Sequence, residues 1–65
     1  MKSLYEIRND SNLSISKLTL DLNNLYNANI RNSKIWEWEN GRSEISESDA
    51  KMLSDYFNVP IKTFI

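Results

Sequence analysis

The sequence predicts an all-α protein, a compact bundle of five short helices in a single domain over residues 1–65. Apolar side chains recur three and four positions apart in several segments, which is the spacing of one helix face. Serines precede two of these segments at the positions that cap helices. No segment alternates apolar and polar residues as a half-buried strand does. A chain of 65 residues has room for only one small core.

The first two helices are expected at residues 2–11 and 15–25. Leu4 and Ile7 form the apolar stripe of the first helix. Ser14 is the N-cap of the second helix, in which Leu18 and Leu22 are four residues apart and form a buried ridge. Both stripes predict a helix that packs against a core.

An asparagine-rich segment, residues 23–29, follows the second helix. Four of its seven residues are asparagine, which favours turns and left-handed backbone. We therefore expect an extended connection between the second and third helices. Leu25 and Tyr26 interrupt the asparagines and are expected to fold back onto the body.

The third helix, residues 31–40, is the segment around which the chain is organised. Its inner face is expected to hold Arg31, Ile35, Trp38 and Glu39. Ser33 and Glu37 lie on the opposite face, and Asn40-Gly41 ends the helix because glycine tolerates a left-handed backbone. The inward carboxylate of Glu39 needs a partner, since an unpaired buried charge is costly.

The last two helices are expected at residues 47–57 and 61–65. Ser46 and Asp49 form a capping box, and Ala50, Leu53 and Phe57 form the buried stripe behind it. Pro60 opens the final helix. The acidic residues near position 47 are thus explained as helix capping rather than as a metal site.

The composition excludes several classes of function. The chain has no Cys and no His, so it lacks a thiol nucleophile, the commonest general base and the commonest transition-metal ligand. We predict no enzymatic activity, no metal and no cofactor. No apolar run approaches the ~20 residues that span a bilayer, and the first residues lack a signal peptide's apolar segment, so a cytoplasmic protein with no membrane partner is expected.

Three motifs together resemble the Cro and phage-repressor (XRE-like) family of helix-turn-helix DNA-binding domains. They are Leu13-Ser14 before a capped helix, I-x-x-x-E-N-G at residues 35–41, and L-S-D-Y-F-N-V-P at residues 53–60. The resemblance covers residues 4–65 and implies a lambda-repressor-like fold, with the third helix in the major groove. It also implies a structural ion pair between Arg8 and Glu39.

The chain departs from the family pattern at three positions. Asn23 stands where the short turn usually has Gly, and residues 24–29 look inserted. Ile15 replaces a common phosphate-binding Gln, and Ile45 replaces a common Pro. The presentation of the third helix is therefore expected to differ from that of the family.

The family's base-contacting positions correspond to Asn32, Ser33 and Glu37, and the helical wheel independently places the last two outward. Asn32 can bridge adenine, whereas Glu37 can accept from cytosine N4 or repel phosphates and so fix the register. Trp36 lies at the boundary and either packs on the inserted loop (Leu25, Tyr26 or Ile30), which we favour, or contacts thymine methyls or sugars. The candidates for phosphate contact are Lys17, Arg31, Lys34, Asn40 and Arg42.

The sequence therefore predicts a transcriptional regulator that binds double-stranded DNA sequence-specifically. The net charge of −1 implies few phosphate contacts per protomer, so a homodimer on an inverted repeat, or the help of a second partner protein, is expected. The dimer contacts come from Tyr56, Phe64 and Ile65, or the chain is the front domain of a longer protein. The alternative is a protein-interaction module of the same fold, such as an antitoxin or anti-regulator, with little DNA binding.

Overall fold

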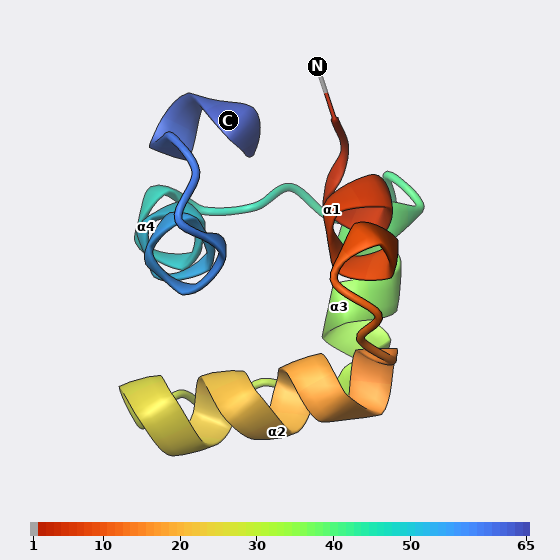
Figure 1. Ribbon diagram of the computed structural model, residues 1–65, viewed down its shortest axis with the longest axis vertical. Helices are drawn as coiled ribbons and strands as arrows, with labels where there is room; N and C mark the ends of the chain where they lie inside the picture. The colour runs from red at the N-terminus through yellow and green to blue at the C-terminus, as the bar shows by residue number, and fades with distance from the viewer. Residues whose placement is uncertain (1) are drawn as a thin grey trace.

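The computed structural model describes residues 2–65, in which every element of secondary structure is a helix and there is no strand. The elements are α1 (Leu4–Asp10), α2 (Ile15–Tyr26), α3 (Asn32–Glu39), α4 (Glu47–Phe57) and the 3-10 helix η1 (Ile61–Thr63). In Figure 1, α2 crosses one end of the molecule. α1 and α3 lie together next to the N-terminal half of α2, and α4 lies across the molecule from α1 and α3. The predicted all-α class is confirmed.

The helix count differs from the prediction at the C-terminal end. The expected fifth helix over residues 61–65 is a three-residue 3-10 turn, closed by hydrogen bonds from Thr63 N to Pro60 O and from Phe64 N to Ile61 O, both 3.0 Å. These bonds span three residues rather than four, which gives the tighter helix. None of the helices in residues 2–65 has the length and apolar character needed to cross a membrane.

The helix boundaries follow from side-chain caps. α1 begins later than predicted because Ser3 is its N-cap. The Ser3 hydroxyl accepts from the backbone N–H of Glu6, and the Glu6 carboxylate accepts from the backbone N–H of Ser3, which together form a capping box. The predicted bounds of α4 are confirmed, and the Ser46 hydroxyl accepts from Asp49 N at 3.2 Å. α3 begins after Arg31, whose side chain makes no cap hydrogen bond and is exposed rather than on the inner face as predicted.

The extended connection between α2 and α3 consists of residues 27–31. α2 runs to Tyr26, and Asn27 ends it in the left-handed region at φ 53°. Asn23 is still helical, and its side-chain amide donates to Ile30 O and accepts from Ile30 N, both at 2.9 Å. Asn23 thus holds the connection in place through two side-chain hydrogen bonds. The prediction for Leu25 was wrong, since this side chain is 66% exposed.

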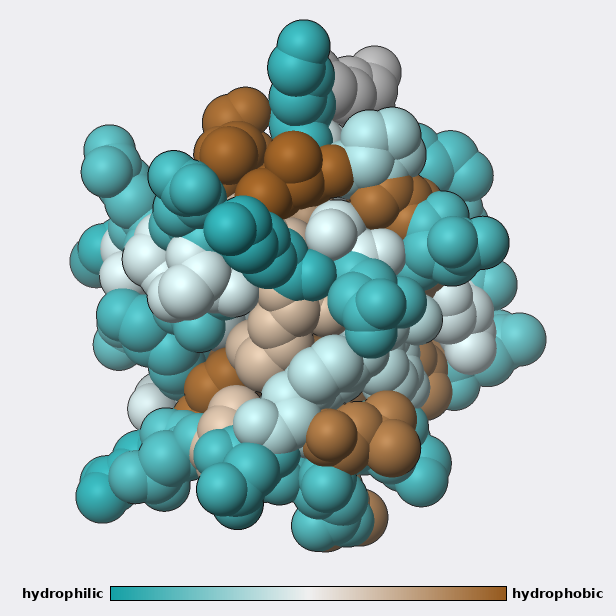
Figure 2. Space-filling view, turned by 90° about the vertical axis from the view of Figure 1, so that its left-hand side faces the viewer, coloured by the Kyte–Doolittle hydropathy of each residue, from teal (hydrophilic) through white to brown (hydrophobic). Residues whose placement is uncertain are grey.

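The core draws side chains from all four α-helices. Its buried apolar residues are Leu4, Leu18, Leu22, Ile35, Trp38, Ala50 and Leu53. The Trp38 indole Nε1 is buried with no hydrogen-bond partner among residues 2–65, so this ring stabilises the fold through apolar packing alone. On the α4 side, apolar side chains reach the surface in separate patches between polar ones (Figure 2).

Two tyrosine–aspartate hydrogen bonds join α2 to α4. Tyr26 OH donates to Asp55 and Tyr56 OH donates to Asp21, each at 2.6 Å. Burial and the hydrogen bond to Asp21 raise the pKa of Tyr56 to about 12. The bonds from Tyr56 and Lys17 lower the pKa of Asp21. Tyr56, expected at a dimer contact, is therefore engaged within the protomer.

Candidate nucleic-acid interface

The inner face of α3 is fixed by apolar packing and by one ion pair. Ile35 is fully buried and Trp38 is 7% exposed. The guanidinium of Arg8 donates two hydrogen bonds to the Glu39 carboxylate, from Nε to Oε2 at 2.6 Å and from Nη2 to Oε1 at 3.0 Å. Its Nη1 donates to Leu13 O at 2.7 Å. This bidentate interaction confirms the predicted Arg8–Glu39 pair and links α3 to α1 and to the residue that precedes the cap of α2.

Electrostatics favour the ionised pair. The hydrogen bond to Glu39 raises the pKa of Arg8, which outweighs the opposing effect of burial. The side chains of Arg8 and Glu39 are only 9% and 3% exposed, so water screens their attraction weakly. The orientation of α3 therefore depends on a charge pair that cannot easily be replaced by solvent.

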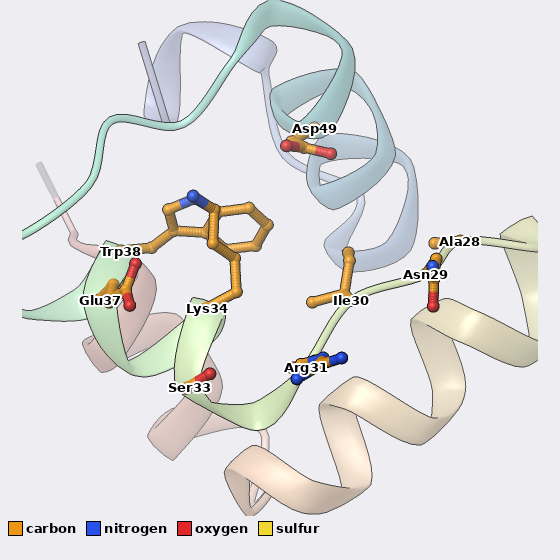
Figure 3. A pocket seen from close by; sticks show the side chains of 9 residues that line it. All are labelled: Ala28, Asn29, Ile30, Arg31, Ser33, Lys34, Glu37, Trp38 and Asp49. Carbon is orange, nitrogen blue, oxygen red and sulfur yellow. The ribbon is translucent and has the colours of Figure 1, made fainter.

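The outer face of α3 carries the predicted base-contacting residues at or near the surface. Asn32, Ser33 and Trp36 are exposed, and Glu37 is half-buried. Ser33 and Glu37 border an open depression of about 510 Å³ between α3, the 28–31 segment and the start of α4 (Figure 3). The depression is lined by Ala28, Asn29, Ile30, Arg31, Ser33, Lys34, Glu37, Trp38 and Asp49.

Each end of α3 uses an asparagine amide inside the protein. At the start, Asn32 Nδ2 donates to Ser16 Oγ at 3.1 Å and links α3 to α2. At the end, Asn40 Nδ2 donates to Trp36 O at 2.8 Å. Neither side-chain oxygen makes a hydrogen bond within residues 2–65, and both residues are exposed, so each has an acceptor available.

The backbone at the exit of α3 is closed to an external anion. The N–H groups of Asn40, Gly41 and Arg42 donate to carbonyl oxygens of α3, at 3.0, 3.4 and 2.8 Å respectively. Gly41 makes this turn at φ +69°, a conformation that favours glycine. Any phosphate contact at this end, including the one predicted for Asn40, must therefore come from side chains.

The favoured position for Trp36 was wrong. Trp36 does not pack on the inserted loop but lines a second depression of about 470 Å³ between α1 and α3, together with Tyr5 and Ile15. The Arg42 guanidinium carbon lies 6.0 Å from its ring centroid, and Trp36 remains 48% exposed. The reason is the position of Trp36 around the helix. The 27–31 connection reaches α3 on the side of Trp38, and Trp36 lies on a different side of the helix.

The five candidates for phosphate contact differ in their availability. Lys34 is half-buried and donates to Ser43 Oγ at 2.7 Å, and Lys17 pairs with Asp21 at 3.1 Å. The charged groups of Arg31 and Arg42 form no hydrogen bond or ion pair within residues 2–65, although Arg42 lies over the Trp36 ring. These two arginines flank α3, one before its first residue and one after its last turn.

Sequence reasoning missed the side-chain bonds that position α3 from outside its inner face. These are Asn23 to Ile30, Asn32 to Ser16, and Lys34 to Ser43. No sequence pattern signals them, because each depends on how two segments meet in space. Within residues 2–65, no group of three or more His, Cys, Asp or Glu residues is arranged to hold a metal ion.

Comparison with known proteins gives no match to this chain, whether with protein-family models, with curated proteins or with solved structures. The function must therefore be inferred from the geometry of α3 and from the chemistry of its residues.

Proposed function

We propose that this protein is a sequence-specific DNA-binding transcriptional regulator of repressor type, in which α3 enters the major groove of double-stranded DNA. The observation that supports this is the division of α3 into two faces. One face is held by Ile35, Trp38 and the Arg8–Glu39 pair. The other presents Ser33 and Trp36, which are exposed, and Glu37, which is half-buried at the rim of the open depression.

The dimensions of α3 suit a groove. An α-helix with its side chains is about 10–12 Å across, and the major groove of B-DNA is about 12 Å wide. Arg31 and Arg42 flank the helix and have no competing ion pair in residues 2–65, so they are the side chains best suited to contact phosphates. Lys17 and Lys34 contribute less in this proposal because both are engaged within the protein.

The family resemblance adds the expected arrangement. A lambda-repressor-like domain would use α2 and α3 as its helix-turn-helix and would bind an inverted repeat as a two-fold homodimer. The longer α2 and the 27–31 connection make this turn longer than the usual 3–4 residues. Of the side chains expected at a dimer contact, Ile65 is the most available, being 61% exposed.

Selection of bound sites from a random pool of DNA duplexes tests the proposal. One sequence should be enriched, and its affinity should fall log-linearly with salt. Two phosphate contacts per protomer predict a slope of about −1.8, and a dimer predicts about −3.6. Failure to enrich any sequence, with equal affinity for unrelated duplexes, would refute the proposal.

Matched variants refine this test. Arg31→Ala and Arg42→Ala should each reduce the slope by about 0.9 per protomer while leaving the preferred sequence unchanged. Lys62→Ala removes an exposed cation in η1, away from α3, and serves as the control with an unchanged slope. Equal slopes in all three variants would exclude the two arginines from the phosphate contacts.

A second candidate is a protein-interaction module of the same fold. It is favoured by the net charge of −1 and by the internal engagement of Lys17 and Lys34. Such a module would enrich no DNA sequence even at low salt. The duplex selection therefore distinguishes the two functions directly.

A further inference from the structure

The outer face of α3 presents hydrogen-bond acceptors more than donors. Asn32 and Asn40 each use an amide N–H within the protein, and their side-chain oxygens accept no hydrogen bond within residues 2–65, although each amide keeps a second N–H. Glu37 adds two carboxylate oxygens, which accept no hydrogen bond within residues 2–65. Ser33 is the one small hydroxyl on this face that can act either way.

Among residues 2–65, no cation forms an ion pair with the Glu37 carboxylate. Lys34 lines the same depression, but its ammonium donates to Ser43 Oγ at 2.7 Å. Arg42 contacts Glu37 only through the backbone, N–H to carbonyl oxygen, and its guanidinium lies over Trp36. Glu37 is thus a half-buried, unpaired carboxylate in the middle of the surface that is proposed to face DNA.

The chemistry of the major groove restricts what such a carboxylate can contact. Only cytosine N4 and adenine N6 offer donors there, and adenine places the N7 acceptor beside its donor. A carboxylate is only an acceptor, so the lone pair of adenine N7 repels it even while adenine N6 donates to it. Cytosine offers its N4 donor with no acceptor beside it in the groove. Phosphates would repel the carboxylate outright.

Trp36 adds an apolar contact surface next to Glu37. Its ring is 48% exposed, lies 6.0 Å from the Arg42 guanidinium carbon and borders the depression shared with Tyr5. The only apolar group that a base displays in the major groove is the C5 methyl of thymine. Adjacent positions on α3 therefore offer an acceptor and an apolar surface to neighbouring bases.

We propose that Glu37 accepts a hydrogen bond from the N4 amino group of a cytosine and that Trp36 packs on the C5 methyl of a neighbouring thymine. This inference rests on the proposed function and specifies the bases that the regulator selects. Of the two roles that the sequence left open for Glu37, it selects the contact with a base over the repulsion of phosphates. It also gives Trp36 a role in selectivity rather than in the core.

Modified duplexes test each contact without changing base pairing. In the site enriched from the random pool, each cytosine is replaced in turn by N4-methylcytosine, which still pairs with guanine but loses its groove-facing N–H. One position should weaken binding roughly 5- to 150-fold, the range for a good base contact. Each thymine is likewise replaced by uracil, and loss of one buried methyl should weaken binding about 4-fold at one position.

The protein variants assign these effects to residues. Glu37→Ala should abolish the difference between the cytosine and N4-methylcytosine duplexes, and Trp36→Ala should abolish the difference between thymine and uracil. Glu44→Ala, an exposed carboxylate in the link after α3, is the matched control and should preserve both differences. Thermal melting of each variant checks that the fold is retained.

The outcomes separate the inference from the proposed function. If a site is enriched but no cytosine is sensitive to N4-methylation, or the sensitivity persists in Glu37→Ala, the role of Glu37 is refuted and the regulator stands. If uracil has no effect at any position, the Trp36 contact is refuted. If no site is enriched, the proposed function itself fails, and this inference falls with it.

Discussion

Replacement of Glu39 by alanine is the sharpest test of how α3 is held. The variant removes the acceptor of two Arg8 hydrogen bonds, at 2.6 and 3.0 Å, and leaves the guanidinium with only the Leu13 carbonyl. Because the Arg8 side chain is 9% exposed, water cannot readily replace the lost carboxylate. The result is a stranded charge in the fold.

The expected loss is large relative to the stability of the domain. Breaking a buried ion pair by removing one partner costs about 3–5 kcal/mol. A domain of 65 residues has a free energy of unfolding of roughly 3–10 kcal/mol. At about 4–8 °C per kcal/mol for a domain of this size, the Tm should fall by about 12 °C or more.

Thermal and urea unfolding followed by circular dichroism measure this loss. Glu37→Ala, a carboxylate on the opposite face of the same helix, is the control and should change stability by no more than about 0.5 kcal/mol. The double variant Arg8→Met with Glu39→Leu should recover most of the loss, because no charge is stranded. Equal Tm values for Glu39→Ala and Glu37→Ala would refute the reasoning.

Three further predictions follow from the backbone and from the polar contacts of α2. Asn27→Ala should cost about 1–2 kcal/mol because this residue is left-handed at φ 53°, whereas Asn27→Gly should be tolerated; equal Tm values would contradict this. Asn23→Ala should cost about 1–3 kcal/mol in urea unfolding, since it leaves the backbone groups of Ile30 unpaired, and faster amide exchange at Ile30 should accompany the loss. The Tm should fall as the pH drops below 3.8, because the folded state lowers the pKa of Asp21. The Tm should also fall as the pH rises from 10 to about 12, because the folded state raises the pKa of Tyr56. Tyr56→Phe should reduce the alkaline fall and leave the part due to Tyr26, whose pKa is also raised by its hydrogen bond to Asp55; an undiminished fall would exclude Tyr56 as a cause.

Local signals in the sequence were sufficient for most of the secondary structure. The bounds of α4 follow from the Ser46 cap and from the spacing of Ala50 and Leu53, which are properties of neighbouring residues. The final turn is different, because five residues after Pro60 hold too few hydrogen bonds to decide between α and 3-10 geometry. Tertiary contacts with α4 decide it instead.

The contact between Arg8 and Glu39 spans 31 residues, so spacing alone does not predict it. The helical wheel indicated that Glu39 points inward, and the family resemblance supplied its partner. The position of Trp36 had no such support. It depends on the side from which the 27–31 connection reaches α3, and that path is fixed by Asn23 and Ile30 rather than by any periodic pattern.

The availability of the basic side chains likewise depends on tertiary structure. Lys34 and Arg42 are both cations near α3, yet the Lys34 ammonium donates to Ser43 and the Arg42 guanidinium has no acceptor within residues 2–65. Composition gives the same charge to each. Counting Lys and Arg in the middle of the chain therefore overestimates the positive charge that this surface offers to phosphates.

An eight-residue helix is too short to be stable in water by itself, so the shape of α3 is imposed by what its inner face contacts. Substitutions at Ile35 or Glu39 should consequently lower both stability and DNA affinity, because they release the helix. Substitutions at Ser33 or Glu37 touch no core contact and should alter affinity alone. Residues only two positions apart on α3 should therefore differ, because one set affects both stability and affinity and the other affects affinity alone. A contact surface gives this result, whereas on an ordinary solvated helix face the outward substitutions would change neither quantity.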